Sequence, residues 1–407
     1  MSLCFSPAMN IADCIKCKGR LCGNGKFCPV IHKMRMQHKI NMTAKQDFFG
    51  EAPNIFVGRF GYPNVNVGLL GTEQYDHHDD PFCWYENNFP IERIIGLRTS
   101  LINSNFKAHV KHTADKLLDV SREVSLAEKP VDVEIHLSKR PFLAININQD
   151  AMPHGPSVPL KSITLTENPK IPTRVEKIVS DTDLKAAEAL RALARRNIDE
   201  HYLTRIFSAG NLGVKQERKL VPTRWSITAV DDTLSKQIIE EIQDNKTTAH
   251  QAYYGSYLGN HYLILIFPGP WSYELFETII GEEMSFATDY ENYNGRTSYA
   301  ANTAGGYYAA RLAILEHLRK QHGAGSVLAL RFITREYWAP LGVWVVRQAA
   351  RTAMKAKPLE FESQELMLTY AAAFVKKKFG VNLTALLKES KLVDNIRKQK
   401  RLNSFLA

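Results

Sequence analysis

At 407 residues, 44% of them hydrophobic and 23% charged, the chain is too long for one hydrophobic core and too apolar to be disordered, so about two domains with small appendages are expected. Lys and Arg outnumber Asp and Glu by 52 to 42, and the resulting net charge of +10 favours polyanionic partners. The apolar runs are shorter than the ~20 residues that span a bilayer and no signal-peptide pattern opens the chain, so a soluble, cytoplasmic protein without membrane contact is expected.

The N-terminal region contains a cysteine cluster with the spacing C-x2-C-x4-C-x5-C. Its members are Cys14, Cys17, Cys22 and Cys28. This spacing is too tight for two disulfides in an intracellular protein, whereas four thiolates can close a tetrahedral shell around zinc. An iron-sulfur cluster uses the same ligands and remains the alternative cofactor. Lys16, Lys18 and Arg20 would give the zinc knuckle a surface for nucleic-acid phosphate, and a purely structural zinc is the other interpretation.

After a basic linker, residues 54–71 read as two short strands around a tight turn, because β-branched and aromatic residues alternate with glycines, Pro63 and Asn64. Arg59 and Tyr62 lie on that turn. They could hold a phosphate or stack a base, and a plain hairpin is the alternative.

A dense polar run follows at residues 76–80, with the sequence DHHDD. These are metal-binding or proton-transfer groups, of which at most two or three can face one site because they are consecutive. The alternative is a solvated loop before a helix that starts near Pro90, packed down by Trp84 and Tyr85. Cys83 is expected to be an unpaired bystander.

The middle of the chain alternates helical and strand patterns. Apolar spacing is helical after Pro90, and residues 131–137 alternate as a strand. Five prolines in residues 151–173 predict an irregular crossing or a domain boundary. A long amphipathic helix is then expected, with an N-cap at Asp181 or Asp183.

Further along, residues 223–230 read as a strand, residues 231–243 as a helix, and residues 247–258 and 260–267 as paired strands. The mixture predicts an α+β (mixed α/β) fold, with a mixed sheet and several helices, a small zinc knuckle at the N-terminus and a flexible C-terminal peptide. The expected modules are residues 1–48, 49–175, 176–390 and 391–407.

Residues 289–320 combine tyrosines, arginines and paired glycines before a helix expected from about Tyr307 to Lys320. Tyrosines can stack bases, arginines can bind phosphates, and a helix N-terminus attracts anions. The candidate contacts with nucleic acid here are Arg296, Tyr299, Tyr307 and Arg311. Arg224 lies in a second basic-aromatic segment, and in both places the alternative is that the aromatic residues fill the edge of a core. No P-loop, nucleophile elbow or dinucleotide fingerprint is present in the sequence.

The chain ends in the pattern Q-x-x-L-x-x-F-L, formed by Gln399, Leu402, Phe405 and Leu406. The pattern resembles the peptide with which proteins dock on the DNA sliding clamp, PCNA. One helical turn would place the three apolar side chains on one side as a plug. Leu406 replaces the usual second aromatic, which should weaken the plug. A terminal helix that packs on its own body is the alternative.

The segments CIKCKGRLCGNGKFC, NIFVGRFGYPNVNVGLLG and KLVPTRWSITAVD, together with the terminal peptide, resemble the archaeal Nre family of DNA-repair proteins, its NreA-like members in particular. The resemblance covers essentially the whole chain. It implies repair of DNA damage with the sliding clamp, a link to nucleotide-excision repair, and a cytoplasmic, nucleoid-associated location.

Two functions follow as hypotheses. The first is a DNA-repair factor without catalytic activity, which binds DNA and is recruited by the clamp. The second is an enzyme acting on damaged DNA or a nucleotide, with its site near Asp76–Asp80, Arg59 and the Tyr/Arg/Gly segment. A concave convergence of those three segments would favour the enzyme.

Overall fold

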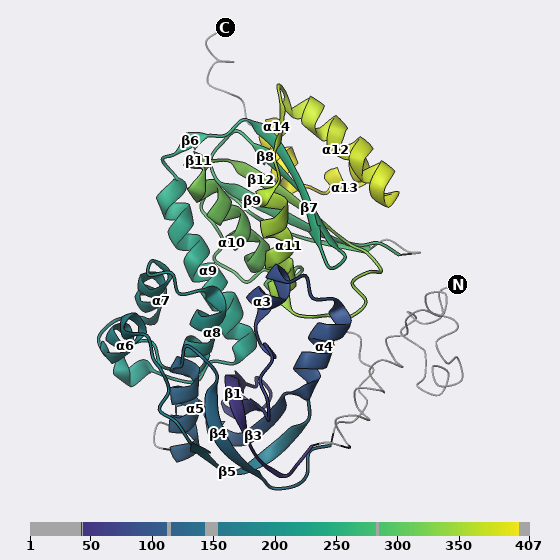
Figure 1. Ribbon diagram of the computed structural model, residues 1–407. Coiled ribbons are helices and arrows are strands. Elements are labelled where there is room, and N and C mark those ends of the chain that lie inside the picture. The colour runs from purple at the N-terminus through teal and green to yellow at the C-terminus, as the bar shows by residue number, and fades with distance from the viewer. Residues whose placement is uncertain (1–41, 43, 112–114, 143–153, 282–284, 399–407) are drawn as a thin grey trace. The chain divides into compact units, whose positions relative to one another are not determined.

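The computed structural model (Figure 1) describes residues 42, 44–111, 115–142, 154–281 and 285–398. Its contacts divide the chain into two compact units. Unit 1 comprises Met1–Val230 with Trp338–Leu341, and unit 2 comprises Asp231–Tyr337 with Gly342–Ala407. Both units combine helices with sheets, which confirms the expected α+β class.

Unit 1 is built on a closed five-stranded barrel. The strands are β1 (Asp47–Val57), β2 (Asn64–Thr72), β3 (Ile102–His109), β4 (Val131–Leu137) and β5 (Ser157–Leu165). Their order around the barrel is β1-β2-β3-β5-β4, and β4 closes onto β1. Only the pairing of β3 with β5 is parallel, and helix α5 (Lys116–Leu126) connects β3 to β4. This strand order, with this helix, is the topology of the OB-fold.

Alternation along the strands fills the barrel. In β4, Val131, Val133, Ile135 and Leu137 are buried, whereas the residues between them are at least partly exposed. The expected strand at residues 131–137 and the expected pair of strands in residues 54–71 are both confirmed. Each fully buried aliphatic side chain contributes about 1.5–3 kcal/mol to folding, so this inward stripe drives closure of the barrel.

The proline-rich segment was expected to be irregular, and this expectation is wrong for its middle part, which forms β5. Pro159 is tolerated because β5 changes partner there, from β3 at residues 157–159 to β4 from Leu160 onward. The helical pattern expected after Pro90 is also not continuous. Helix α4 (Ile91–Ser100) is followed by strand β3, and α5 begins only after that strand.

The long helix expected from Asp181 or Asp183 is two helices. These are α7 (Ala186–Ala194) and α8 (Glu200–Ser208), and the short α6 (Thr173–Ser180) precedes them. Asn197 between them has a φ of 59°, which no helix can continue through. Asp199 then starts a new helix, since its carboxylate accepts a hydrogen bond of 2.8 Å from the amide of Tyr202.

The strand expected at residues 223–230 is also wrong. After the short 3-10 turn Lys215–Glu217, residues Thr223–Ile242 form one helix, α9, which begins directly after Pro222. The division between the two units falls inside this helix, after Val230. The reason is that α8 packs on β1 and α5, so the helices after β5 belong to the barrel.

Unit 2 is built on a mixed six-stranded sheet with the order β10-β9-β12-β8-β7-β13. Its strands are β7 (His250–Tyr257), β8 (Asn260–Phe267), β9 (Ser272–Ile279), β10 (Ser285–Glu291), β12 (Ser326–Ile333) and β13 (Leu359–Phe361). The paired strands expected at residues 247–258 and 260–267 are therefore confirmed as β7 and β8. Strands β9 and β12 run parallel and the other pairs are antiparallel. A separate two-stranded sheet pairs β6 (Lys246–Thr247) with β11 (Gly323–Ala324).

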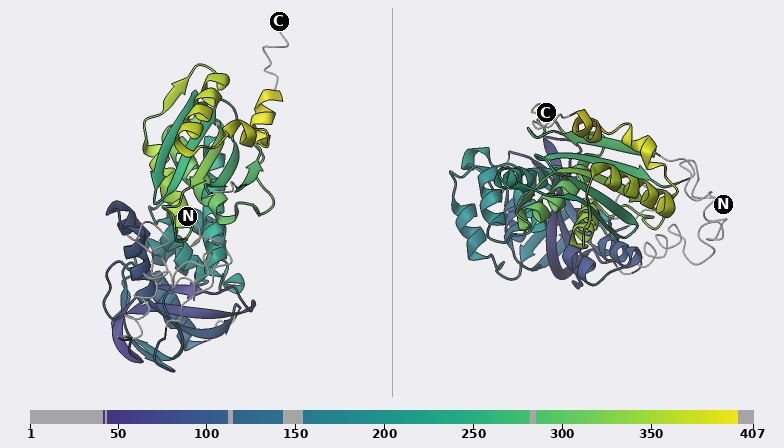
Figure 2. Two further views of the ribbon diagram at one scale, coloured as in Figure 1. Left: turned by 90° about the vertical axis from the view of Figure 1, so that its right-hand side faces the viewer. Right: turned by 90° about the horizontal axis from the view of Figure 1, so that it is seen from above.

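Helices cover both faces of this sheet (Figure 2). One group is α10 (Ala304–Lys320) and α11 (Val343–Lys355), and the other is α12 (Gln364–Phe379), α13 (Leu383–Leu387) and α14 (Lys391–Lys398). The alternation of side chains along β7 separates the two groups. Ala252 belongs to the same core cluster as Met367 of α12, whereas the ring of Tyr253 contacts His317 of α10. None of the helices in the described ranges combines the length and the hydropathy that a membrane span requires.

A buried carboxylate on β9 holds the start of α14. Glu274 is fully buried, and its two oxygens accept hydrogen bonds from the Ser390 hydroxyl at 2.5 Å, the Leu392 amide at 3.0 Å and the Lys391 amide at 3.1 Å. Burial raises the pKa of Glu274 above its ordinary value, although these hydrogen bonds lower it. The first turn of α14 is thus fixed to the sheet.

Candidate nucleic-acid interface

The turn between β1 and β2 presents exposed aromatic rings beside an arginine. Phe60 is 81% exposed and Tyr62 is 46% exposed, and Arg59 is exposed with its guanidinium carbon 5.0 Å from the centre of the Phe60 ring. Gly61 between the rings has a φ of 83°, which only a glycine adopts at little cost. The hairpin is confirmed, and its turn points an apolar and basic surface at solvent.

The first residues of α9 lie against this turn. The amide of Val57 donates a hydrogen bond of 2.9 Å to the Thr223 hydroxyl, which fixes the helix start to the end of β1. Trp225, 45% exposed, packs on Tyr62 with ring centres 5.2 Å apart, and the neighbouring Arg224 is exposed. Two segments that the sequence pointed to separately therefore form one surface. We call this surface the turn patch, comprising Arg59, Phe60, Tyr62, Arg224 and Trp225.

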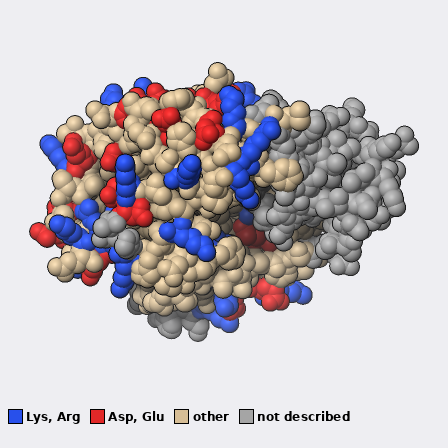
Figure 3. Space-filling view, turned by 90° about the horizontal axis from the view of Figure 1, so that it is seen from below, with Lys and Arg blue, Asp and Glu red and all other residues tan. Residues whose placement is uncertain are grey.

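The two chain segments next to the turn patch carry basic but no acidic side chains. Neither residues 54–72 nor residues 101–114 contain an Asp or a Glu. The lysines Lys107, Lys111 and Lys219 are exposed. They lie near the same end of the barrel, since the amide of Val110 donates to Pro63 and the amide of Leu220 donates to Val110, both at 2.9 Å. Figure 3 shows the molecule from below, where Asp and Glu side chains stand among Lys and Arg.

The polar run at residues 76–80 is only partly a solvated loop. His78 and Asp79 are buried, and Trp84 at the start of α3 (Pro81–Glu86) is buried and donates from its indole to the His77 carbonyl at 2.6 Å. The expectation that Trp84 packs the loop down is confirmed.

Asp79 is the centre of this loop's contacts. Its carboxylate accepts from the side-chain amide of Asn54 at 2.5 Å, and it lies 3.4 Å from Nε2 of His201 and 3.7 Å from the guanidinium of Arg98. These partners come from β1, α8 and α4. Burial opposes ionisation of Asp79, but His201, Arg98 and Asn54 outweigh it and hold the pKa of Asp79 well below its ordinary value.

His201 completes the arrangement and was not expected from the sequence. Burial lowers the pKa of His201, yet the charge and the hydrogen bond of Asp79 outweigh that effect and raise the pKa above its ordinary value. The side chain of His201 is 33% exposed. An imidazole oriented by a buried carboxylate can act as a general acid or base. A single histidine within an amphipathic helix gives no sequence signal of this kind.

Three side chains of the same loop could hold a metal ion. The ligand atoms of His77, Asp80 and Cys83 lie within 4.8 Å of one another, a mixed nitrogen, oxygen and sulfur set that suits zinc. Two of these side chains also stabilise the loop without a metal ion. Nδ1 of His77 lies 2.9 Å from the carboxylate of Asp80, and the same carboxylate caps α3 by accepting a hydrogen bond from the amide of Cys83. Cys83, expected to be an unpaired bystander, is a free cysteine and lies beside His77 and Asp80.

In unit 2 the helix expected from about Tyr307 is confirmed as α10, but two of its candidate residues are wrong. Tyr307 and Arg311 are both 0% exposed, so neither can reach DNA. Arg311 instead forms buried ion pairs with Glu291 at 2.7 Å and Asp232 at 2.5 Å. The cause is that α10 is covered over nearly its whole circumference, so the aromatic and basic residues serve the core.

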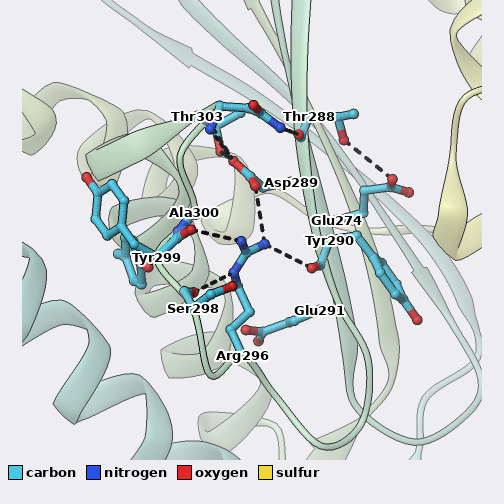
Figure 4. Close-up of polar contacts among 12 residues, drawn as sticks. Glu274, Thr288, Asp289, Tyr290, Glu291, Arg296, Ser298, Tyr299, Ala300 and Thr303 are labelled. Carbon is cyan, nitrogen blue, oxygen red and sulfur yellow. Dashed lines mark hydrogen bonds and ion pairs between the residues drawn. The ribbon is translucent and has the colours of Figure 1, made fainter.

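Arg296 holds its own loop together (Figure 4). The guanidinium lies 3.2 Å from Asp289 and donates to the carbonyls of Tyr290 at 3.0 Å, Tyr299 at 3.1 Å and Ser298 at 3.1 Å. With its donors directed at its own backbone, Arg296 is a poor candidate for phosphate. Tyr299 remains 52% exposed and stacks on Tyr308 with ring centres 5.6 Å apart.

Two sets of predicted residues lie outside the described ranges. They are the four cysteines with their basic neighbours, Cys14, Lys16, Cys17, Lys18, Arg20, Cys22 and Cys28, and the terminal peptide residues Gln399, Leu402, Phe405 and Leu406. The described candidates divide between the units: Arg59 and Asp76–Asp80 belong to unit 1, and the Tyr/Arg/Gly segment belongs to unit 2.

Comparison with known proteins assigns nearly the whole chain. Residues 21–284 match the archaeal Nre N-terminal family and residues 291–405 match the archaeal Nre C-terminal family. The DNA repair protein NreB of Archaeoglobus fulgidus is 36% identical over 97% of this chain and 100% of its own length. NreA of the same organism is 40% identical over 90% of this chain and 94% of its own length. NreA of Haloferax volcanii is 36% identical over 82% of this chain and 84% of its own length. No solved structure matches the chain. By both its family matches and its relatives, the chain belongs to the archaeal Nre family.

Proposed function

We propose that this protein is a DNA-repair factor that binds DNA through the turn patch of unit 1. The repair role is supported by the relatives, which are named DNA repair proteins. DNA binding is supported by one observation above the others. Exposed aromatic rings and arginines from residues 59–62 and 224–225 meet on one surface, next to residues 54–72 and 101–114, which contain no Asp or Glu.

The chemistry of the turn patch suits DNA. Exposed aromatic rings stack on bases, worth about 1–3 kcal/mol per base and largely independent of sequence. Arg59 and Arg224 are exposed and can neutralise phosphates. Neighbouring exposed rings form a contiguous apolar patch, and such patches mark interaction sites more often than scattered single side chains do. Binding with modest sequence preference and strong salt dependence follows.

The test is a titration of labelled DNA with the whole protein at several salt concentrations. Each phosphate contact adds about 0.7–0.9 to the slope of log affinity against log salt, so the double variant Arg59→Ala and Arg224→Ala should lower that slope by about 1.4–1.8. The double variant Arg195→Ala and Arg196→Ala removes the same charge from exposed residues after α7 and serves as the control. Undetectable affinity at low salt, or affinity indifferent to salt, would refute DNA binding.

We also propose that the terminal peptide recruits the protein to the sliding clamp and that the four N-terminal cysteines bind zinc. Support for both comes from the spacing of residues in the sequence. Titration of a sliding clamp with the whole chain and with a version ending at Lys398 tests recruitment. Equal binding by the two would defeat it.

A second candidate function is an enzyme acting on damaged DNA or a nucleotide. The pairing of buried Asp79 with partly exposed His201 supports it, since this arrangement can move a proton. Damaged DNA and nucleotides incubated with the whole protein should then be turned over, and His201→Asn should abolish turnover. The melting temperature of this variant should fall as well, because buried Asp79 loses its His201 partner, so turnover is measured well below that temperature. Lack of turnover by the unaltered protein would remove this candidate.

A further inference from the structure

We infer that the outer side of β2 and β3, together with the turn patch, is a binding track for single-stranded DNA. This inference rests on the proposed function and names the form of DNA that unit 1 takes. We call the surface the outer face, comprising Phe56, Asn64, Asn66, Lys107 and His109.

The barrel topology places this surface where OB-folds bind their ligands. In that topology oligonucleotides lie across strands 2 and 3 and contact the loop between strands 1 and 2. Here that loop carries Arg59, Phe60 and Tyr62, the exposed residues of the turn patch. One fold can serve many functions, so the side chains on this face determine what it binds.

The outer face is polar and basic. Asn64 of β2 pairs with His109 of β3, and Asn66 pairs with Lys107, and all four side chains are exposed. Asparagine amides both donate and accept hydrogen bonds, as base edges require, and Lys107 offers a charge for phosphate. The absence of any Asp or Glu from residues 54–72 and 101–114 makes the surface complementary to a polyanion.

An exposed ring extends the track away from the turn. Phe56 of β1 is 40% exposed and lies opposite Gly68 of β2, so it has a glycine beside it on the neighbouring strand. Gly68 cannot be replaced without displacing a neighbour, because a Cβ there would lie 1.6 Å from Oδ1 of Asn103. From Asn64 to Gly68 the strand rises by about 13 Å, room for a few nucleotides.

Several observations favour a single strand over a duplex. The rings of Phe60, Tyr62 and Trp225 can stack only on bases whose faces are open, and in a duplex those faces are covered by neighbouring bases. The asparagines of the outer face can likewise reach the pairing edges of bases only when these edges are free. A peptide that adds a strand to β1 or β4 is excluded, because these two strands pair with each other.

The experiment compares a labelled single strand of about 20 nucleotides, longer than the ~4–16 nucleotides that an OB-fold covers, with a duplex of the same length. The whole protein is titrated into each while fluorescence anisotropy is followed. The face variant is the double substitution Asn66→Ala and Lys107→Ala. The control is Lys177→Ala, an exposed lysine of α6.

We expect tighter binding to the single strand than to the duplex. The face variant should weaken single-strand binding at least fivefold and leave its melting temperature near that of the parent, while the control binds like the parent. Equal or tighter duplex binding, or single-strand binding untouched by the face variant, would overturn the track while leaving DNA binding by the protein intact. Failure to bind either DNA would overturn the proposed DNA binding itself and the track with it.

Discussion

Replacing Trp225 with Ala tests the turn patch at its most specific point. One side of the Trp225 ring packs on Tyr62, with ring centres 5.2 Å apart, and 45% of the residue is exposed. Only one face is thus open to a base, so we expect the lower part of the ~1–3 kcal/mol that stacking contributes. A loss of about 1–2 kcal/mol corresponds to roughly 5- to 30-fold weaker binding of single-stranded DNA.

Anisotropy titrations of the parent, Trp225→Ala and Trp225→Phe would measure this loss. The phenylalanine variant should retain most of the affinity, because it keeps an aromatic face. Phe49→Ala is the matched control, since Phe49 is 68% exposed but lies near the other end of β1, far from the turn. All three variants should fold like the parent, because each side chain removed is at least 45% exposed. If Trp225→Ala bound DNA as tightly as the parent, stacking at the turn patch would be refuted.

Three more predictions concern other parts of the chain. The double variant Phe405→Ala and Leu406→Ala should lower the affinity for the clamp more than tenfold, since each hot-spot side chain typically contributes about 2 kcal/mol or more. Its melting temperature should stay unchanged. If the variant were less stable and the parent protein did not bind the clamp, the tail would instead pack on its own body. Cys22→Ser with Cys28→Ser should remove one equivalent of zinc per chain by elemental analysis, and an iron-sulfur absorption band in the parent would contradict the zinc assignment. Because the pKa of Glu274 is raised in the folded state, folding is linked to proton uptake at this residue, so lowering the pH from 7 toward about 4.3 should stabilise the parent relative to Glu274→Gln. Denaturant titrations at several pH values check the sign, and the opposite trend would show that the hydrogen bonds to Glu274 outweigh its burial.

Elements with strong local patterns could be predicted from the sequence. The strand at residues 131–137 was found because its buried and exposed residues alternate without interruption. The segment 223–230 was misread because its β-branched residues favour a strand, whereas Pro222 starts a helix whose Val230, Ile238 and Ile242 are buried. Closure of the barrel was beyond reach, since the parallel pairing of β3 with β5 joins residues about fifty positions apart.

The candidate site shows the same limit. Arg59 and Tyr62 were found from the glycine-rich turn, and Arg224 from its basic-aromatic segment, yet the contact that joins them spans Val57 to Thr223. Arg311 was misassigned because its carboxylate partners Glu291 and Asp232 lie 20 and 79 residues away, where no local pattern connects them. Local sequence patterns can point to candidate binding residues. Whether such a residue faces solvent or lies in the core depends on contacts with residues far away in the sequence.

Buried Glu274 makes the position of α14 depend on a strand that lies far away in the sequence. Its partners Ser390, Lys391 and Leu392 follow 116 to 118 residues later, at the start of the last described helix. A substitution that removes this carboxylate leaves the Ser390 hydroxyl and the Leu392 amide buried without their acceptor. A change in β9 would therefore reach the C-terminal helix directly, although more than a hundred residues separate the two in the sequence.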